Sequence, residues 1–176
     1  MKRYIALLRG INVSGQKLIK MEALREYFVM PGFKNITTYI QSGNVLFDAK
    51  EQDEAVLRKK IETQLLKKLG YAVPTIVRSI EDVQKVISNN PFKQVLTEDT
   101  RKLYVTFLSD TPPADAMDLL KKYLNEQEEI HIIGKDLYFV TVAFGNTKLN
   151  NSVIEKKLGV SATARNWATV NKITAL

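Results

Sequence analysis

The stretch YIQSGNVLFDA, residues 39–49, decides the fold of the first half of the chain. Two mostly apolar segments flank the polar residues Gln41, Ser42, Gly43 and Asn44. Flanking segments of this kind are typical of β-strands, and Ser42-Gly43 is typical of the tight turn between paired strands. The stretch therefore predicts a β-hairpin, and it raises the question whether the polar turn also faces a ligand.

The residues on either side extend this hairpin into a larger pattern. Upstream, residues 4–8 are apolar throughout, as in a strand buried on both faces, and residues 20–30 predict a helix that stops before Pro31-Gly32. Downstream, residues 51–70 predict the clearest helix, with acids at its start and lysines at its end, and residues 73–79 predict another strand. The order β-α-β-β-α-β is the ferredoxin-like pattern.

The second half of the chain repeats this order after a polar, turn-rich linker at residues 88–100. Strands are predicted at residues 102–108, 129–133, 137–142 and 161–164, and helices at 112–124, 150–159 and 165–173. The predicted fold class is α+β, with two ferredoxin-like (βαββαβ) subdomains, the second degenerate, packed together with an extra C-terminal helix. Residues 1–90 are expected to form the first subdomain with a connecting helix, and residues 91–176 the second.

Composition excludes several classes of site. The chain has no cysteine, which excludes disulfides, thiol catalysis and thiolate metal sites, and its one histidine, His131, excludes a histidine-rich zinc site. We therefore predict no metal site, and the sequence names no cofactor. No apolar run approaches the roughly 18 residues of a membrane span, and the run at residues 4–8 is too short for a signal peptide. The expected location is the cytoplasm.

Positive charge is concentrated in the first half. Residues 1–90 carry 15 lysines and arginines against nine acids, whereas residues 91–176 carry 11 against 10. A basic half can attract nucleic acid or phosphorylated metabolites. The alternative interpretation is a solvated helix face, because many of the lysines lie in the predicted helix at residues 51–70.

The predicted topology brings two polar, glycine-bearing segments together. In a ferredoxin-like unit the end of the first strand lies beside the turn between the second and third strands. This places Arg9 and Gly10 with Asn12, Ser14, Gly15 and Lys17 next to Gln41, Ser42 and Asn44. Cations, amides and glycine-freed N–H groups favour a polar or anionic ligand. The alternative is that Asn12 and Asn44 bind the loop backbone and each other.

The same loop partly matches a phosphate-binding P-loop. Gly10 and Gly15 have the required spacing, but Lys17 comes one position late and no serine or threonine follows to hold magnesium. Asp48 ends a strand in the way a magnesium ligand could, but the hairpin places it at the opposite end of the sheet from the glycine loop. Hydrolysis of a nucleoside triphosphate is therefore not predicted. Phosphate binding stays open, because the helix at residues 20–30 begins just after the loop.

A third polar segment lies near the C-terminus, where Arg165, Asn166 and Trp167 are further ligand-binding candidates. Arg165 and Trp167 could offer charge and stacking to a base or sugar. The alternative is that Trp167 packs an amphipathic helix onto the body of the protein while Asn166 or Thr163 caps that helix.

Four segments together carry a resemblance to a known family: YIALLRGINVSGQKLIKMEALREYF, TYIQSGNVLF, NPF and KKLGVSATARNWATVNKI. Over nearly its whole length the chain resembles the uncharacterised, mostly bacterial family known as domain of unknown function 1697. The resemblance implies a cytoplasmic protein with two α/β subdomains of ferredoxin-like character and no established activity. The family's motif residues fall on Arg9, Gly10, Asn12, Gly15, Tyr39, Gln41, Ser42, Gly43, Asn44, Arg165, Asn166, Trp167, Thr169 and Lys172.

Two functions follow as competing hypotheses. The first is a protein that binds a phosphorylated or nucleotide-like small molecule, with enzymatic activity left open. The second is binding of single-stranded nucleic acid, in which Tyr4, Tyr39 and Phe47 would stack bases on the first sheet. A membrane partner is not expected.

Overall fold

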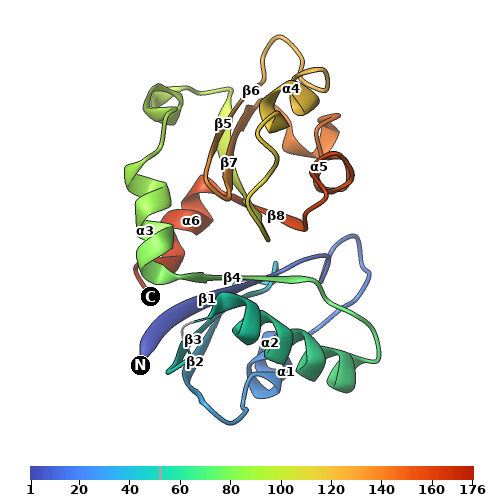
Figure 1. Ribbon diagram of the computed structural model, residues 1–176, viewed down its shortest axis with the longest axis vertical. Helices are drawn as coiled ribbons and strands as arrows, with labels where there is room; N and C mark the ends of the chain where they lie inside the picture. Colours follow the sequence, from blue (N-terminus) through green and yellow to red (C-terminus); the bar gives the residue numbers. More distant parts are fainter. Residues whose placement is uncertain (52) are drawn as a thin grey trace. The chain divides into compact units, whose positions relative to one another are not determined.

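The computed structural model describes residues 1–51 and 53–176, and the chain divides into two compact units (Figure 1). The first unit contains Met1–Gln84 and Leu176, and the second contains Lys85–Ala175. Each unit holds one four-stranded antiparallel sheet. The α+β class with two ferredoxin-like subdomains is confirmed.

The first unit has the predicted order of elements. They are β1 (Lys2–Leu8), α1 (Met21–Tyr27), β2 (Phe33–Tyr39), β3 (Asn44–Ala49), α2 (Glu54–Leu69) and β4 (Thr75–Ser79). The strand order in the sheet is β2-β3-β1-β4. The hairpin of β2 and β3 therefore forms as predicted, and β3 lies between β2 and β1.

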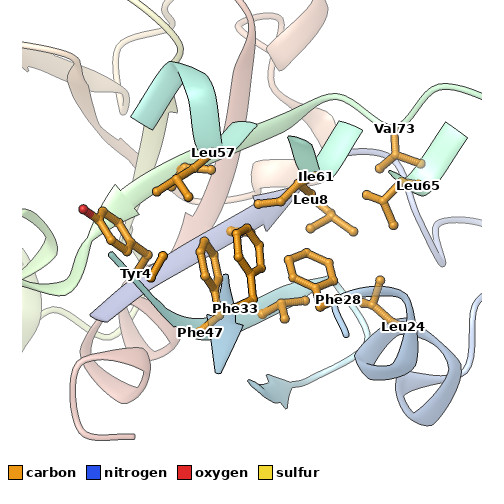
Figure 2. Packing of buried hydrophobic residues seen from close by; sticks show 14 of the residues in the cluster. Tyr4, Leu8, Leu24, Phe28, Phe33, Phe47, Leu57, Ile61, Leu65 and Val73 are labelled. Atoms are coloured by element: carbon orange, nitrogen blue, oxygen red, sulfur yellow. The ribbon is translucent and has the colours of Figure 1, made fainter. Parts of the chain in front are cut away.

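Successive side chains of the central strands β1 and β3 point to opposite faces of the sheet. One set of them is buried against α1 and α2, which cover the same face of the sheet (Figure 1). Tyr4, Phe33 and Phe47 from the strands meet Phe28 and helix residues such as Leu57 in this core (Figure 2). The ring centroids of Phe33 and Phe47 are 4.3 Å apart, and those of Tyr4 and Phe47 are 5.7 Å apart, both stacked.

The opposite set of side chains on the central strands is also buried. Ile5, Leu7 and Leu46 have no exposed surface. A strand that alternates between core and water would leave every second residue polar. The continuous apolar run of β1 therefore reflects burial of both of its faces, as its sequence predicts.

The sequence marks the ends of α2 more clearly than the end of α1. Helix α2 begins after Asp53, whose carboxylate accepts the N–H groups of Ala55 and Val56, and ends at Gly70 with φ of 78°. Helix α1 is shorter than predicted, because the N–H of Phe28 bonds the carbonyl of Arg25 instead of the carbonyl four residues back. This tighter last turn ends the helix before the proline is reached.

The second unit contains all six elements of the same pattern. They are β5 (Lys102–Leu108), α4 (Ala116–Lys121), β6 (Glu129–Ile133), β7 (Asp136–Thr141), α5 (Asn151–Leu158) and β8 (Ala162–Asn166). The strand order is β6-β7-β5-β8, which matches the first sheet strand for strand. The second unit is reduced mainly in its second helix, since α5 has eight residues against 16 in the equivalent α2, whereas α4 has six against seven in α1.

Two local predictions were wrong in the second half. The strand expected at residues 161–164 continues to Asn166, so α6 (Trp167–Ile173) begins two residues later than predicted. The expected linker contains the 3₁₀ helix η1 (Lys93–Thr97), in which Val95 is buried. It follows α3 (Ile80–Ser88), which contains the division between the two units. A short 3₁₀ turn with one apolar anchor leaves little periodicity to recognise.

Within the part of the chain that is described, none of the helices has the length and apolar character of a membrane span.

Candidate functional site

The two polar segments predicted to meet do so at one end of the first sheet. Leu7 of β1 pairs with Asn44 of β3, and the N–H of Leu8 donates to the carbonyl of Gly43 at 2.9 Å. The loop that leaves β1 therefore starts against the hairpin turn. We call residues 9–17 together with residues 40–44 the loop–turn site.

Asn12 ties the loop to the turn. Its Nδ2 donates to the carbonyl of Gln41 at 2.8 Å and to that of Ile19 at 3.1 Å, and its Oδ1 accepts the N–H of Ile19 at 2.7 Å. The N–H of Asn12 also donates to the carbonyl of Lys17 at 3.1 Å. The Asn12 amide is therefore committed to the protein's own backbone, as the structural alternative expected.

Asn44 closes the turn from the strand side. Its side chain is fully buried, and Nδ2 donates to the carbonyl of Tyr39 at 2.9 Å and to Oγ of Ser42 at 3.1 Å. Both asparagines thus shape the loop–turn site and do not present their amides as its surface. The outer surface belongs to exposed residues such as Gln41 and Ser42.

Gly43 is required where the two segments touch. Its φ is 86°, and a Cβ built there would lie 2.7 Å from Cδ1 of Ile11 and 2.9 Å from Cβ of Leu8. Glycine alone combines this backbone conformation with such a close approach. The preceding turn residue Ile40 also has a positive φ, 49°, which is rare for a β-branched side chain.

The loop backbone changes conformation repeatedly between residues 10 and 17. Gly10, Asn12, Ser14, Gly15 and Lys17 have φ between 48° and 73°, while residues 11, 13 and 16 do not have positive φ. Among the described residues, no hydrogen-bond acceptor is found for the N–H groups of Gly10, Ser14, Gly15 and Lys17. Turns that bring successive N–H groups to one side form concave anion-binding surfaces known as nests.

Two cationic side chains, those of Arg9 and Lys17, belong to the same loop. Arg9 is half-buried, and burial lowers the pKa of its guanidinium from the ordinary value. Lys17 is exposed, and its Nζ lies 5.2 Å from the centre of the Tyr71 ring. Such a contact limits the directions in which the ammonium points. The loop–turn site therefore combines positive charge with unpaired donors.

The three C-terminal candidates form a group of their own in the second unit. Arg165 is buried on β8, and its Nη1 donates to Oγ1 of Thr163 at 2.9 Å and to the carbonyl of Ala164 at 2.8 Å. Burial lowers the pKa of Arg165 to about 10. Asn166 caps α6, since its Oδ1 accepts the N–H of Thr169 at 2.8 Å. This capping is the structural role that the sequence offered as the alternative.

One basic hollow was missed by the sequence interpretation. It lies at the end of the first sheet where β1 begins and β3 ends, encloses about 620 Å³, and is lined by Met1, Phe33, Lys34, Lys50 and Lys60 among others. Asp48 lies at the same end and accepts from Arg3 at 3.2 Å. Lys34 lies on β2, Lys50 directly follows β3 and Lys60 lies on α2, with Glu51 as the acid on the lining, so no local pattern in the sequence marks this hollow.

A family model described as "Protein of unknown function (DUF1697)" matches residues 1–138. Among solved structures, the chain is similar to "The structure of conserved bacterial protein SP0830 from Streptococcus pneumoniae", with a TM-score of 0.77 and 22% identity. That similarity covers 99% of this chain and 97% of the other. At this identity it supports the fold alone. The curated proteins give no match.

Proposed function

Because the chain belongs to the family described as protein of unknown function (DUF1697), whose description assigns no activity, we propose a function from the geometry of the loop–turn site. The proposal is that this protein is cytoplasmic and binds a phosphorylated or nucleotide-like small molecule there. The contacting groups are Arg9, Lys17, Gln41, Ser42 and the loop N–H groups, including those of Gly10 and Gly15.

The observation that carries this proposal is the loop backbone. Four exposed residues, Gly10, Ser14, Gly15 and Lys17, have positive φ and N–H groups without an acceptor among the described residues. Folding alone needs only a short connection from β1 to α1. A loop that instead leaves several exposed donors without an acceptor in the described part of the chain, in a segment that also contains Arg9 and Lys17, supports binding of an anion with many acceptor oxygens.

The two asparagines support the proposal indirectly. Asn12 and Asn44 fix the loop and the turn through side-chain bonds to the carbonyls of Gln41, Ile19 and Tyr39. A loop held in one conformation loses less entropy when a ligand binds. Their role is thus to position the donors, and the phosphate groups of the ligand would contact the loop N–H groups and cations.

The alternative, binding of single-stranded nucleic acid, retains support from the charge of the first half. However, Tyr4 and Phe47 have 1% and 0% exposed surface and lie in the core with the helices. Only Tyr39, which is half-buried, remains of the three rings expected to stack bases. We therefore favour the small molecule. Steep weakening of oligonucleotide binding with salt would instead favour nucleic acid.

A thermal-shift experiment tests the proposal with inorganic phosphate, ADP and ribose 5-phosphate as probes. A ligand present at about 100 times its Kd stabilises the folded state by about 2.7 kcal/mol, so the wild-type melting temperature is expected to rise by several degrees. Arg9→Ala is expected to weaken binding at least tenfold, because a charge-assisted hydrogen bond is lost.

The matched control is Arg25→Ala, which removes the same charge from an exposed position on α1. It is expected to keep the ligand-induced shift. A second variant, Lys17→Gln, tests the site even if Arg9→Ala fails to fold. The proposal fails if no probe stabilises the wild type, or if the loop variants bind as tightly as the control.

A further inference from the structure

The second unit contains a hollow that the proposed function does not use. It encloses about 360 Å³, within the range typical of small-molecule pockets. Leu96 of η1, Lys102, Leu103 and Tyr104 of β5, and Asn166 and Trp167 at the junction of β8 and α6 contribute to its lining. None of these residues belongs to the loop–turn site.

The repeated fold explains how this hollow arises. Tyr4 of β1 pairs with Ser79 of β4 in the first sheet, and Tyr104 of β5 pairs with Asn166 of β8 in the second. These two pairs hold equivalent positions in the repeated fold, and we call the surroundings of each pair a corner of its sheet. In the first unit Nζ of Lys2 lies 3.0 Å from a carboxylate oxygen of Glu81, two residues after Ser79.

The equivalent residues in the second unit are Lys102 and Ala168, and Ala168 lines the hollow. Alanine removes the carboxylate that would pair with Lys102, whose Nζ instead donates to the carbonyl of Glu98 at 3.3 Å. The second corner thus has room and a cation for which the described residues provide no ion pair.

The polar side chains among the lining residues carry mainly donors without an acceptor in the chain as described. Oδ1 of Asn166 is occupied by the N–H of Thr169, whereas its Nδ2 has no acceptor among the described residues. The same holds for the indole N–H of Trp167 and the hydroxyl of Tyr104, both on half-buried side chains. A ligand for this lining must therefore offer acceptor atoms.

The remaining lining is apolar and aromatic. Leu103 is buried and Leu96 is 49% exposed. The Tyr104 ring is held by stacking on Phe144, with centroids 4.2 Å apart. Indole and phenol rings offer flat apolar faces with a polar edge, which suit a planar ring more than a bare phosphate.

We propose that this hollow binds a flat heteroaromatic molecule of nucleoside size, which stacks on the aromatic lining and presents acceptor atoms to Asn166, Trp167 and Lys102. This is a second ligand site, independent of the loop–turn site, and the chemistry that it recognises is a ring with carbonyl or ring-nitrogen acceptors.

Trp167 makes a direct test available because it is the only tryptophan in the chain. The full-length protein is titrated with uridine, with inosine and with toluene while tryptophan emission is recorded. Uridine or inosine is expected to give a saturable change in emission at concentrations where toluene, which lacks acceptors, gives none. Arg9→Ala is expected to leave the nucleoside titration unchanged, which separates this site from the loop–turn site.

Asn166→Asp provides the sharpest variant. Aspartate still caps α6 through an oxygen, but it replaces the donating amide with an acceptor, so nucleoside affinity is expected to fall about tenfold. The matched control is Asn150→Asp. Asn150 caps α5 in the same way, with Oδ1 accepting the N–H of Val153 at 3.0 Å, and it does not line the hollow.

Three results would overturn this inference. The first is the absence of any emission change with either nucleoside at millimolar concentration. The second is equal nucleoside affinity in the Asn166→Asp and Asn150→Asp variants. The third is binding of toluene as tight as that of the nucleosides, which would remove the role of the acceptor atoms.

Discussion

Replacing Gly43 with alanine is expected to lower the free energy of unfolding of the first unit by about 3 kcal/mol. Two effects add at this position. The backbone has φ of 86°, and the new methyl group would lie 2.7 Å from Ile11 and 2.9 Å from Leu8. Both neighbours are buried, at 1% exposure each, so neither can move aside freely.

The matched control is Gly15→Ala. Gly15 has a similar φ of 71°, but no heavy atom lies within 4 Å of a Cβ built there. Only the backbone term remains, so the expected loss is about 1 kcal/mol. Hydrogen exchange of the β1 and β3 amides measures both losses in the first unit. Equal losses would contradict the close contact between loop and turn.

Replacing Phe47 with alanine is expected to cost about 4 kcal/mol of the same free energy. The Phe47 ring has no exposed surface, and its centroid lies 4.3 Å from that of Phe33, 5.7 Å from that of Tyr4 and 6.0 Å from that of Phe28. Figure 2 shows these four rings within one cluster. Alanine would leave a cavity bordered by three aromatic rings, which cannot all move to fill it.

Phe47→Leu is the companion variant for this core position. Leucine restores most of the lost volume, and the expected cost falls to about 1.5 kcal/mol. The measurement is again hydrogen exchange in β1 and β3, because these strands belong to the first unit itself, whereas Trp167 lies in the second. A loss below about 1 kcal/mol for Phe47→Ala would show that the ring is not part of a tightly packed cluster.

Much of the first unit could be predicted because its signals are local and regular. The apolar run of β1, the hairpin at Ser42-Gly43 and the caps Asp53 and Gly70 each have a direct physical meaning at the sequence level. The contact of Asn12 with Gln41 then follows from topology, since the end of β1 must lie beside the turn that precedes β3.

Other features could not be predicted, because neither the periodicity of the sequence nor a residue type marks them. The positive φ of Ser14, Lys17 and Ile40 occurs at residues that rarely adopt it, and no glycine marks them. The early end of α1 reflects one tightened turn at Phe28. The hollow beside Trp167 needs Tyr104, which is more than 60 residues away in the chain and is placed only by the pairing of β5 with β8.

Amide chemical shifts of the labelled protein during a titration with ADP test most directly whether the loop–turn site binds anions. The largest shifts are expected at Gly10, Ser14, Gly15 and Lys17, with smaller shifts at Gly43. Shifts confined to Lys34, Lys50 and Lys60 around the basic hollow at the other end of the sheet would contradict binding at the loop–turn site, as would a spectrum that ADP leaves unchanged.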